Sequence, residues 1–293
     1  MQLYILRFFY WLATHLSLAN VERIATLLGD LTWLFHSRVR RDLEANLHQV
    51  MPHATERQLA RASRQALRTL CRIYADELRT PSIPKSEFLA ALDVHGREHL
   101  DQSLQDGKGA ILTTAHFGAP QIVAQILALW DYPTMTVVEH TQPEAIFQFM
   151  WKLRAKRGLR LIASDSSMLP LIRILRRENG VVALAVDRDV TKSGIEVPFF
   201  DRAARMPDGA VRLALSTDAP IHIAYCRRKV NGEYEAWIEP ALSLPPSDAP
   251  LEERVRHGMA TVLERIERFI RAEPSQWVAT VPVWNSEQPQ LPR

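Results

Sequence analysis

The feature that most constrains this fold is an alternation of short apolar runs with helix-length segments, which starts near Asp93. Short apolar runs fit strands that are buried on both faces, and the segments between them are long enough for crossover helices. This alternation is typical of an α/β fold with a mostly parallel central sheet flanked by helices. The predicted strands are 110–115, 134–139, 159–163, 181–187, 219–228 and 233–239.

Helices and one hairpin complete this predicted body. The helices are expected at 143–157, 166–177 and 251–272. Val230-Asn231-Gly232 separates the last two strands, and Asn-Gly is a strong hairpin signal. We therefore expect those strands to pair antiparallel at the edge of the sheet.

The segment ahead of the body is predicted to be helical. Asn20 is a candidate N-cap for a helix starting at Val21, and Ala54-Thr55 is suited to open a long helix. The prolines of 81–84 end this pattern. A helical layer over 21–80 and a sheet-containing body over 90–293 are thus expected within one α/β domain, 21–293.

The first 20 residues are apolar and aromatic but carry Arg7 and His15. They fall short of the ~20 uninterrupted apolar residues that a membrane-spanning helix needs. The aromatic cluster of residues 8–11 beside a cation favours a helix that lies in the membrane interface and anchors the protein. Packing against the protein's own core and a true span are the alternatives.

The composition excludes several classes of function. The chain has 36 basic and 33 acidic residues, a net charge of +3, which does not indicate a nucleic-acid binder. Two cysteines are too few for a disulfide framework, and no zinc spacing is present. With 11 glycines the chain has no phosphate-cradling loop, and it lacks the GxSxG of serine hydrolases. We expect no metal and no cofactor.

The segment from Gly109 to Gln121 carries the strongest chemical signal. Its apolar run predicts a buried strand that ends at His116-Phe117-Gly118, and Pro120 suits the first turn of a following helix. A histidine at the carboxyl end of a parallel strand stands where open α/β sheets place their ligands. The alternative is a hydrogen-bonded structural histidine.

Several motifs in register resemble one family. HFG followed by two residues and a polar one is similar to the HxxxxE/D signature of the bacterial lipid A biosynthesis (lauroyl/myristoyl) acyltransferases. The chain most resembles the phosphatidylinositol mannoside acyltransferase branch of that family. The other matching residues are Arg40-Arg41, Asn46-Leu47 ahead of Pro52, Glu139, Arg154, Asp187-Arg188-Asp189, Gly194, Glu196, Phe199-Phe200, Gln276-Trp277 and Trp284.

The resemblance implies a membrane-associated O-acyltransferase. Such an enzyme moves a fatty acyl group from acyl-CoA or acyl carrier protein to a hydroxyl of a glycolipid, such as a phosphatidylinositol mannoside or a lipid A precursor. The expected location is the cytoplasmic face of the inner membrane, as a peripheral or monotopic protein. Free of metal and cofactor, the site would depend on its own side chains.

In this reading His116 is the base that takes the hydroxyl proton. The family's acidic residue, five positions on, is replaced by Gln121, whose amide oxygen accepts a hydrogen bond but brings no charge. We expect reduced activity, offset in part if the carboxylate of Glu139 lies close. The alternative is a catalytically degenerate member that binds lipid or a partner protein without turnover.

The resemblance also assigns residues to substrate binding. It implies an active-site ion pair between Glu139 and Arg154, for which a structural salt bridge is the alternative. Arg188 is the group best suited to meet a phosphate of the acyl carrier. The acidic residues of the same segment would order the loop or contact a sugar hydroxyl, with ordinary turn chemistry as the alternative: Asp187, Asp189 and Glu196.

Overall fold

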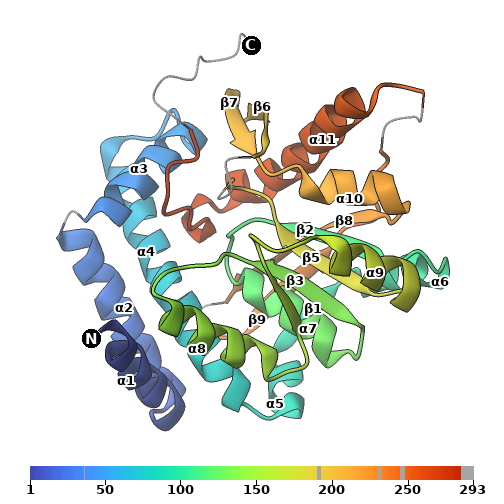
Figure 1. Ribbon diagram of the computed structural model, residues 1–293. Helices are drawn as coiled ribbons and strands as arrows, with labels where there is room; N and C mark the ends of the chain where they lie inside the picture. The colour runs from blue at the N-terminus through green and yellow to red at the C-terminus, as the bar shows by residue number, and fades with distance from the viewer. Residues whose placement is uncertain (36, 190–192, 230–231, 245–247, 285–293) are drawn as a thin grey trace.

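The computed structural model describes residues 1–35, 37–189, 193–229, 232–244 and 248–284. Its centre is a seven-stranded sheet in the order β1-β9-β8-β2-β5-β3-β4 (Figure 1). All neighbouring strands are parallel except β8 and β9. The strands are β1 (Leu92–His95), β2 (Ala110–Thr114), β3 (Thr134–Val138), β4 (Arg160–Ala163), β5 (Val181–Ala185), β8 (Ile221–Arg228) and β9 (Tyr234–Ile238).

The predicted mostly parallel sheet flanked by helices is therefore confirmed. Each of the six predicted strands is present, and the structure adds β1, which the sequence analysis missed. β8 and β9 form the expected antiparallel hairpin, but β1 pairs with β9 on its outer side, so the hairpin is not at the sheet edge. Val230 and Asn231 of its predicted turn lie outside the described residues.

The two faces of the sheet are buried under different helices. Because side chains alternate along a strand, Ile111 of β2 faces one core and Leu112 the other. Figure 1 shows α9, α10 and α11 on one side of the sheet and α5 and α7 on the other. These elements are α5 (Lys85–Ala90), α6 (Arg97–Gln105), α7 (Pro120–Leu129), α9 (Leu169–Glu178), α10 (Gly209–Thr217) and α11 (Leu251–Ala272).

Four helices form a layer beside one end of the sheet (Figure 1). They are α1 (Gln2–His15), α2 (Leu18–Leu34), α3 (Arg38–Val50) and α4 (Glu56–Arg79). Thr55 caps α4 as predicted, in a reciprocal capping box with Gln58. The predicted N-cap at Asn20 is wrong: Ser17 caps α2, and its hydroxyl accepts from the Asn20 N–H. Among the described residues, no helix combines the length and apolarity needed to cross a membrane.

A second, two-stranded sheet of β6 (Ile195–Phe199) and β7 (Arg202–Met206) was not predicted. Its turn places Phe200 and Asp201 at positive φ, 49° and 60°. Tertiary hydrogen bonds hold this turn: the Phe200 N–H donates to Glu267 on α11, and its carbonyl accepts from Gln49 on α3. No turn was predicted at Phe200-Asp201, because phenylalanine rarely adopts this backbone conformation.

Candidate active site

His116 lies on the loop that joins β2 to α7. β2 ends at Thr114 and α7 begins at Pro120, so the loop leaves the sheet at the carboxyl end of a central strand. Gly118 is in the left-handed region (φ 58°), and a Cβ there would lie 2.0 Å from the carbonyl oxygen of Cys226. Only glycine fits this close approach, which fixes the turn that follows the histidine.

The C-terminal segment holds this loop in place. The Gly118 N–H donates to the Gln276 carbonyl, and the Val278 N–H donates to the His116 carbonyl, both at 2.8 Å. A bridge between Phe117 and Trp277 continues the pairing. Residues more than 150 positions apart in the sequence thus fix the backbone of His116.

The imidazole of His116 is hydrogen bonded to Asp187. His116 Nδ1 lies 2.7 Å from Asp187 Oδ1, and the His116 backbone N–H donates to Oδ2 at 3.0 Å. β2 and β5 are adjacent and parallel, with Thr114 opposite Ala185. Continuing that register by two residues brings 116 opposite 187, so the sheet itself creates the pair.

Asp187 is fully buried (0 % exposed), and a third donor completes its environment. The indole Nε1–H of Trp277, also 0 % exposed, donates to Oδ2 at 2.8 Å. Burial alone raises the pKa of Asp187, but the His116 ring and the hydrogen bonds from His116 and Trp277 outweigh it. They lower this pKa to about 2, from an ordinary value of 3.8.

An ionised Asp187 fixes the tautomer of the histidine. A carboxylate only accepts hydrogen bonds, so Nδ1 of a neutral imidazole must carry the proton and Nε2 keeps its lone pair. His116 lines the pocket described below, and Nε2 has no hydrogen-bond partner within the described part of the chain. This is the arrangement that a general base requires.

Gln121 does not hold the imidazole, contrary to the sequence prediction. Its Nε2 donates to the Ile73 carbonyl of α4 at 3.3 Å, while the imidazole nitrogen binds Asp187 instead. Gln121 is the second residue of α7 and lines the pocket. The negative charge that Gln121 lacks is supplied by Asp187, two residues after the end of β5. Contact with a sugar hydroxyl was one of the roles expected for Asp187 from the sequence. That expectation is wrong, because Asp187 is fully buried (0 % exposed).

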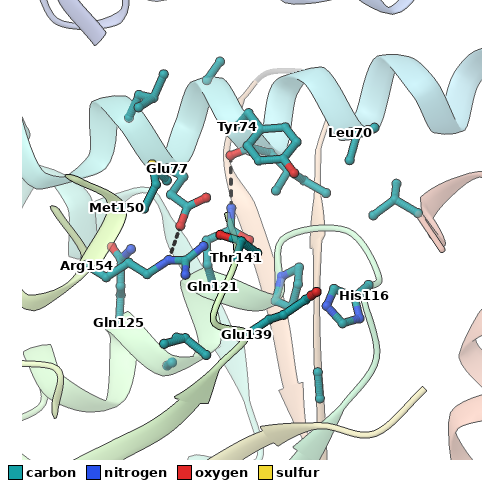
Figure 2. Close-up of a pocket in the computed structure, with 18 of the residues that line it drawn as sticks. Leu70, Tyr74, Glu77, His116, Gln121, Gln125, Glu139, Thr141, Met150 and Arg154 are labelled. Atoms are coloured by element: carbon teal, nitrogen blue, oxygen red, sulfur yellow. Dashed lines mark hydrogen bonds and ion pairs between the residues drawn. The ribbon is translucent and has the colours of Figure 1, made fainter. Parts of the chain in front are cut away.

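The expected ion pair between Glu139 and Arg154 is not formed, because each has another partner. Arg154 of α8 (Glu144–Ala155) pairs with the buried Glu77 of α4, as Figure 2 shows. Glu139, directly after β3, accepts from Arg188 at 2.9 Å. All four of these side chains line one pocket, so the structure brings the predicted residues together but exchanges their partners.

The other two predicted acidic residues lie outside the pocket lining. Asp189 accepts from the Gly194 N–H at 2.7 Å, which fits the expectation that it orders its loop. Glu196 is exposed on β6, opposite Arg205 of β7. Residues 190–192 of the predicted loop are outside the described residues.

The pocket has a volume of about 710 Å³ and is lined mainly by apolar side chains. α1, α2, α4, α7 and α8 form its walls, and β2, β3 and β5 contribute the remaining side. Representative lining residues are Phe9, Leu28, Leu78, Leu112, Phe147 and Met150. The volume and the apolar lining suit an apolar ligand, and His116 is among the polar groups that face it.

One group of side chains within the described residues has metal-ligand spacing, and it lies elsewhere. Asp93, His95 and Glu235 place ligand atoms within 4.8 Å of one another at the outer edge of the sheet. Their carboxylates are already paired, Asp93 with Lys229 and Glu235 with Arg227. None of them lines the pocket.

Two residues of the site were missed by sequence reasoning. Trp277 was noticed as a motif but given no role, although its indole binds the carboxylate beside His116. Glu77 gave no local signal, because it is one acidic residue within a long amphipathic helix.

A histidine–carboxylate pair that faces an apolar pocket is typical of enzymes that use a general base on an apolar substrate, and acyl transfer is one such reaction. The chain matches the family model of bacterial lipid A biosynthesis acyltransferases over residues 2–286. It therefore belongs to that family and is an acyltransferase.

Named relatives agree with this membership. The phosphatidylinositol mannoside acyltransferase of Mycobacterium tuberculosis (strain ATCC 25618 / H37Rv) is 29% identical over 224 residues, which cover 75% of this chain and 69% of the relative. The protein of that name from Mycolicibacterium smegmatis is 27% identical, with 75% and 71% covered. A lipid A biosynthesis acyltransferase of Haemophilus influenzae is 24% identical over 257 residues, with 86% and 78% covered.

Proposed function

We propose that this protein is a membrane-associated O-acyltransferase that moves a fatty acyl group from a thioester to a hydroxyl of a phosphoglycolipid. The observation that carries the proposal is the hydrogen bond between His116 and the buried Asp187, made where the apolar pocket begins. The pocket would hold the acyl chain, and the imidazole would act on the group that attacks its carbonyl.

The proposed reaction follows from the tautomer of His116 in which Nδ1 carries the proton. His116 Nε2 takes the proton of the acceptor hydroxyl while the oxygen attacks the thioester carbonyl carbon. Asp187 stabilises the imidazolium that forms, because its charge faces the Nδ1–H. When the tetrahedral intermediate collapses, the carbon–sulfur bond breaks, and the imidazolium returns the proton to the leaving thiolate. The products are an ester and a free thiol.

Arg188 supports a phosphate-bearing substrate. Its guanidinium is partly exposed, lines the pocket and is held by Glu139 at 2.9 Å. A guanidinium in this position suits a phosphate of the acyl carrier or of the acceptor headgroup. The donor is then acyl-CoA or acyl carrier protein.

The first helix supports membrane attachment. Along α1, Tyr4, Phe8 and Trp11 are exposed, whereas Phe9 and Leu12 line the pocket. Large aromatic residues on an exposed helix face suit the interface of a bilayer. An acyl acceptor held in that bilayer would reach the site from the same side. We place the protein as a peripheral protein on the cytoplasmic face of the inner membrane.

The acceptor is proposed from the relatives. Two of them are named phosphatidylinositol mannoside acyltransferases, and they are more similar to this chain than the lipid A relative is. A phosphatidylinositol mannoside or a similar phosphoglycolipid is accordingly preferred to a lipid A precursor. Against the catalytically degenerate alternative, which the uncharged Gln121 helped to motivate, we set the carboxylate of Asp187 beside His116.

Product analysis tests the proposal. The protein is incubated with acyl-CoA or acyl carrier protein thioester and with a total glycolipid extract, and the lipids are followed by mass spectrometry. One added acyl ester on a phosphoglycolipid is the expected result. Free fatty acid as the sole product would show a thioester hydrolase, and unchanged substrates with both donors would show a protein without turnover.

A further inference from the structure

Among the described residues that line the pocket, one buried side-chain oxygen has no hydrogen-bond partner. Gln125 of α7 lines the pocket and is only 2 % exposed, and its Oε1 makes no hydrogen bond within the described residues. A buried acceptor oxygen without a donor is unfavourable, because its hydrogen bonds to water are lost and no protein hydrogen bond replaces them. Such an oxygen needs a donor, and a ligand in the pocket can supply one.

The position of Gln125 differs from that of the other polar groups. Gln121 and Gln125 are four residues apart on α7, so they share one face of the helix and are separated by a rise of about 6 Å. Gln121 is already bonded to the Ile73 carbonyl. In the view of Figure 2, Gln125 and Arg154 are drawn at the left of the group and His116 at the right.

The charges in this part of the pocket favour an uncharged ligand group. The Glu77 carboxylate and the Arg154 guanidinium pair with each other, so this end of the pocket does not call for a charged ligand. An amide offers both an acceptor oxygen and N–H donors. A hydroxyl group, which also donates and accepts, is the matching partner, whereas a saturated hydrocarbon leaves the amide unsatisfied.

We propose that Gln125 recognises a hydroxyl carried on the acyl chain, away from the thioester, and so gives this enzyme a preference for hydroxylated acyl donors. The inference rests on the proposed function, because it takes the pocket to be the acyl site. Gln125 is a specificity residue here and takes no part in the proton transfer at His116.

Binding of unreactive donors tests this assignment separately from turnover. Thioether analogues of acyl-CoA, either saturated or monohydroxylated at different carbons of one chain length, are titrated calorimetrically into the full-length protein. We expect at least one hydroxylated isomer to bind the wild type about tenfold more tightly than the saturated chain, the ratio for one good hydrogen bond. Gln125→Leu should abolish this preference and bind the saturated chain more tightly than the wild type does.

Controls separate the possible outcomes. Gln125→Met is a second apolar variant in case Gln125→Leu does not fold, and Gln102→Leu removes an exposed amide from α6. Equal binding of all chains by the wild type, or a preference that survives in both Gln125 variants, would overturn the inference. An increase in acceptor KM with an unchanged binding ratio would also overturn it, because the amide would then face the acceptor. If the preference holds but no donor is transferred, the proposed function fails and the hydroxyl site stands.

Discussion

Replacing Asp187 by asparagine isolates the charge beside His116. The amide has nearly the volume of the carboxylate but a single acceptor oxygen. That oxygen can keep the two donors at Oδ2, the His116 N–H and the Trp277 indole, which lie 3.0 and 2.8 Å away. The NH₂ group then faces His116 Nδ1, which must become an acceptor. The ring proton moves to Nε2, the atom that should take the proton of the acceptor hydroxyl.

The expected loss of kcat follows from the contribution that the His116–Asp187 pair makes to the rate. A general base contributes about 10²- to 10⁴-fold, and the corresponding change in a serine protease triad costs about 10⁴ in kcat. We therefore expect Asp187→Asn to lower kcat by between about 10² and 10⁴, which is roughly 3 to 5 kcal/mol at about 1.4 kcal/mol per decade. Substrate binding should change little, because Asp187 is fully buried.

Single-turnover transfer of a labelled acyl group measures this loss, with circular dichroism to establish that the variant folds. Asp218→Asn is the matched control: it makes the same chemical change at an exposed residue that ends α10 at positive φ, where asparagine is well tolerated. A folded Asp187→Asn protein with the kcat of the wild type would refute the role of the carboxylate.

Four further changes test other parts of the site and its supports. Gln121→Glu should not raise kcat, because Asp187 already supplies the charge; a rise of tenfold or more would restore the role first assigned to Gln121. Trp277→Phe removes a hydrogen bond to a buried carboxylate and should lower the free energy of unfolding by about 1.5–3 kcal/mol in urea titrations, and no loss would contradict its role. Gly118→Ala puts a Cβ 2.0 Å from a carbonyl oxygen at a positive φ and should cost more than about 1 kcal/mol by the same assay, unlike Gly209→Ala, where a Cβ would have no atom within 4 Å and φ is not positive. Burial raises the pKa of Asp76 from 3.8 to about 6, so the stability gained by protonating Asp76 in the folded state is present below pH 3.8 and is lost as the pH rises through 6. The free energy of unfolding of the wild type, relative to that of Asp76→Asn, should therefore fall over that pH range, and a pH-independent difference would contradict the raised pKa.

The sequence was sufficient for the elements of the sheet because their signals are local. Apolar runs gave six of its strands, and α11 (251–272) begins and ends where its periodicity predicted. Ala54-Thr55 was expected to open a long helix, and Thr55 is indeed the N-cap of α4, in a capping box with Gln58. β1 was missed because only two of its four residues are apolar, and its partner β9 lies 142 positions later along the chain.

The candidate site was harder to predict because its key contacts are between distant residues. His116 was correctly placed at the end of a strand, but its partner was sought five residues away on the next helix. The true neighbour depends on β5 inserting beside β2, and a single sequence does not give the order of strands. For the same reason Arg154 was paired with Glu139 although its partner, Glu77, is 77 positions away.

The most direct test of the account is the rate of transfer of a radiolabelled acyl group from acyl-CoA or acyl carrier protein to a phosphoglycolipid extract, by the wild type and by His116→Ala. We predict measurable ester formation by the wild type and a loss of about 10²-fold or more in the folded variant. Equal transfer by the two proteins would contradict the assignment of His116 as the base, and no transfer by the wild type with either donor would contradict the proposed reaction.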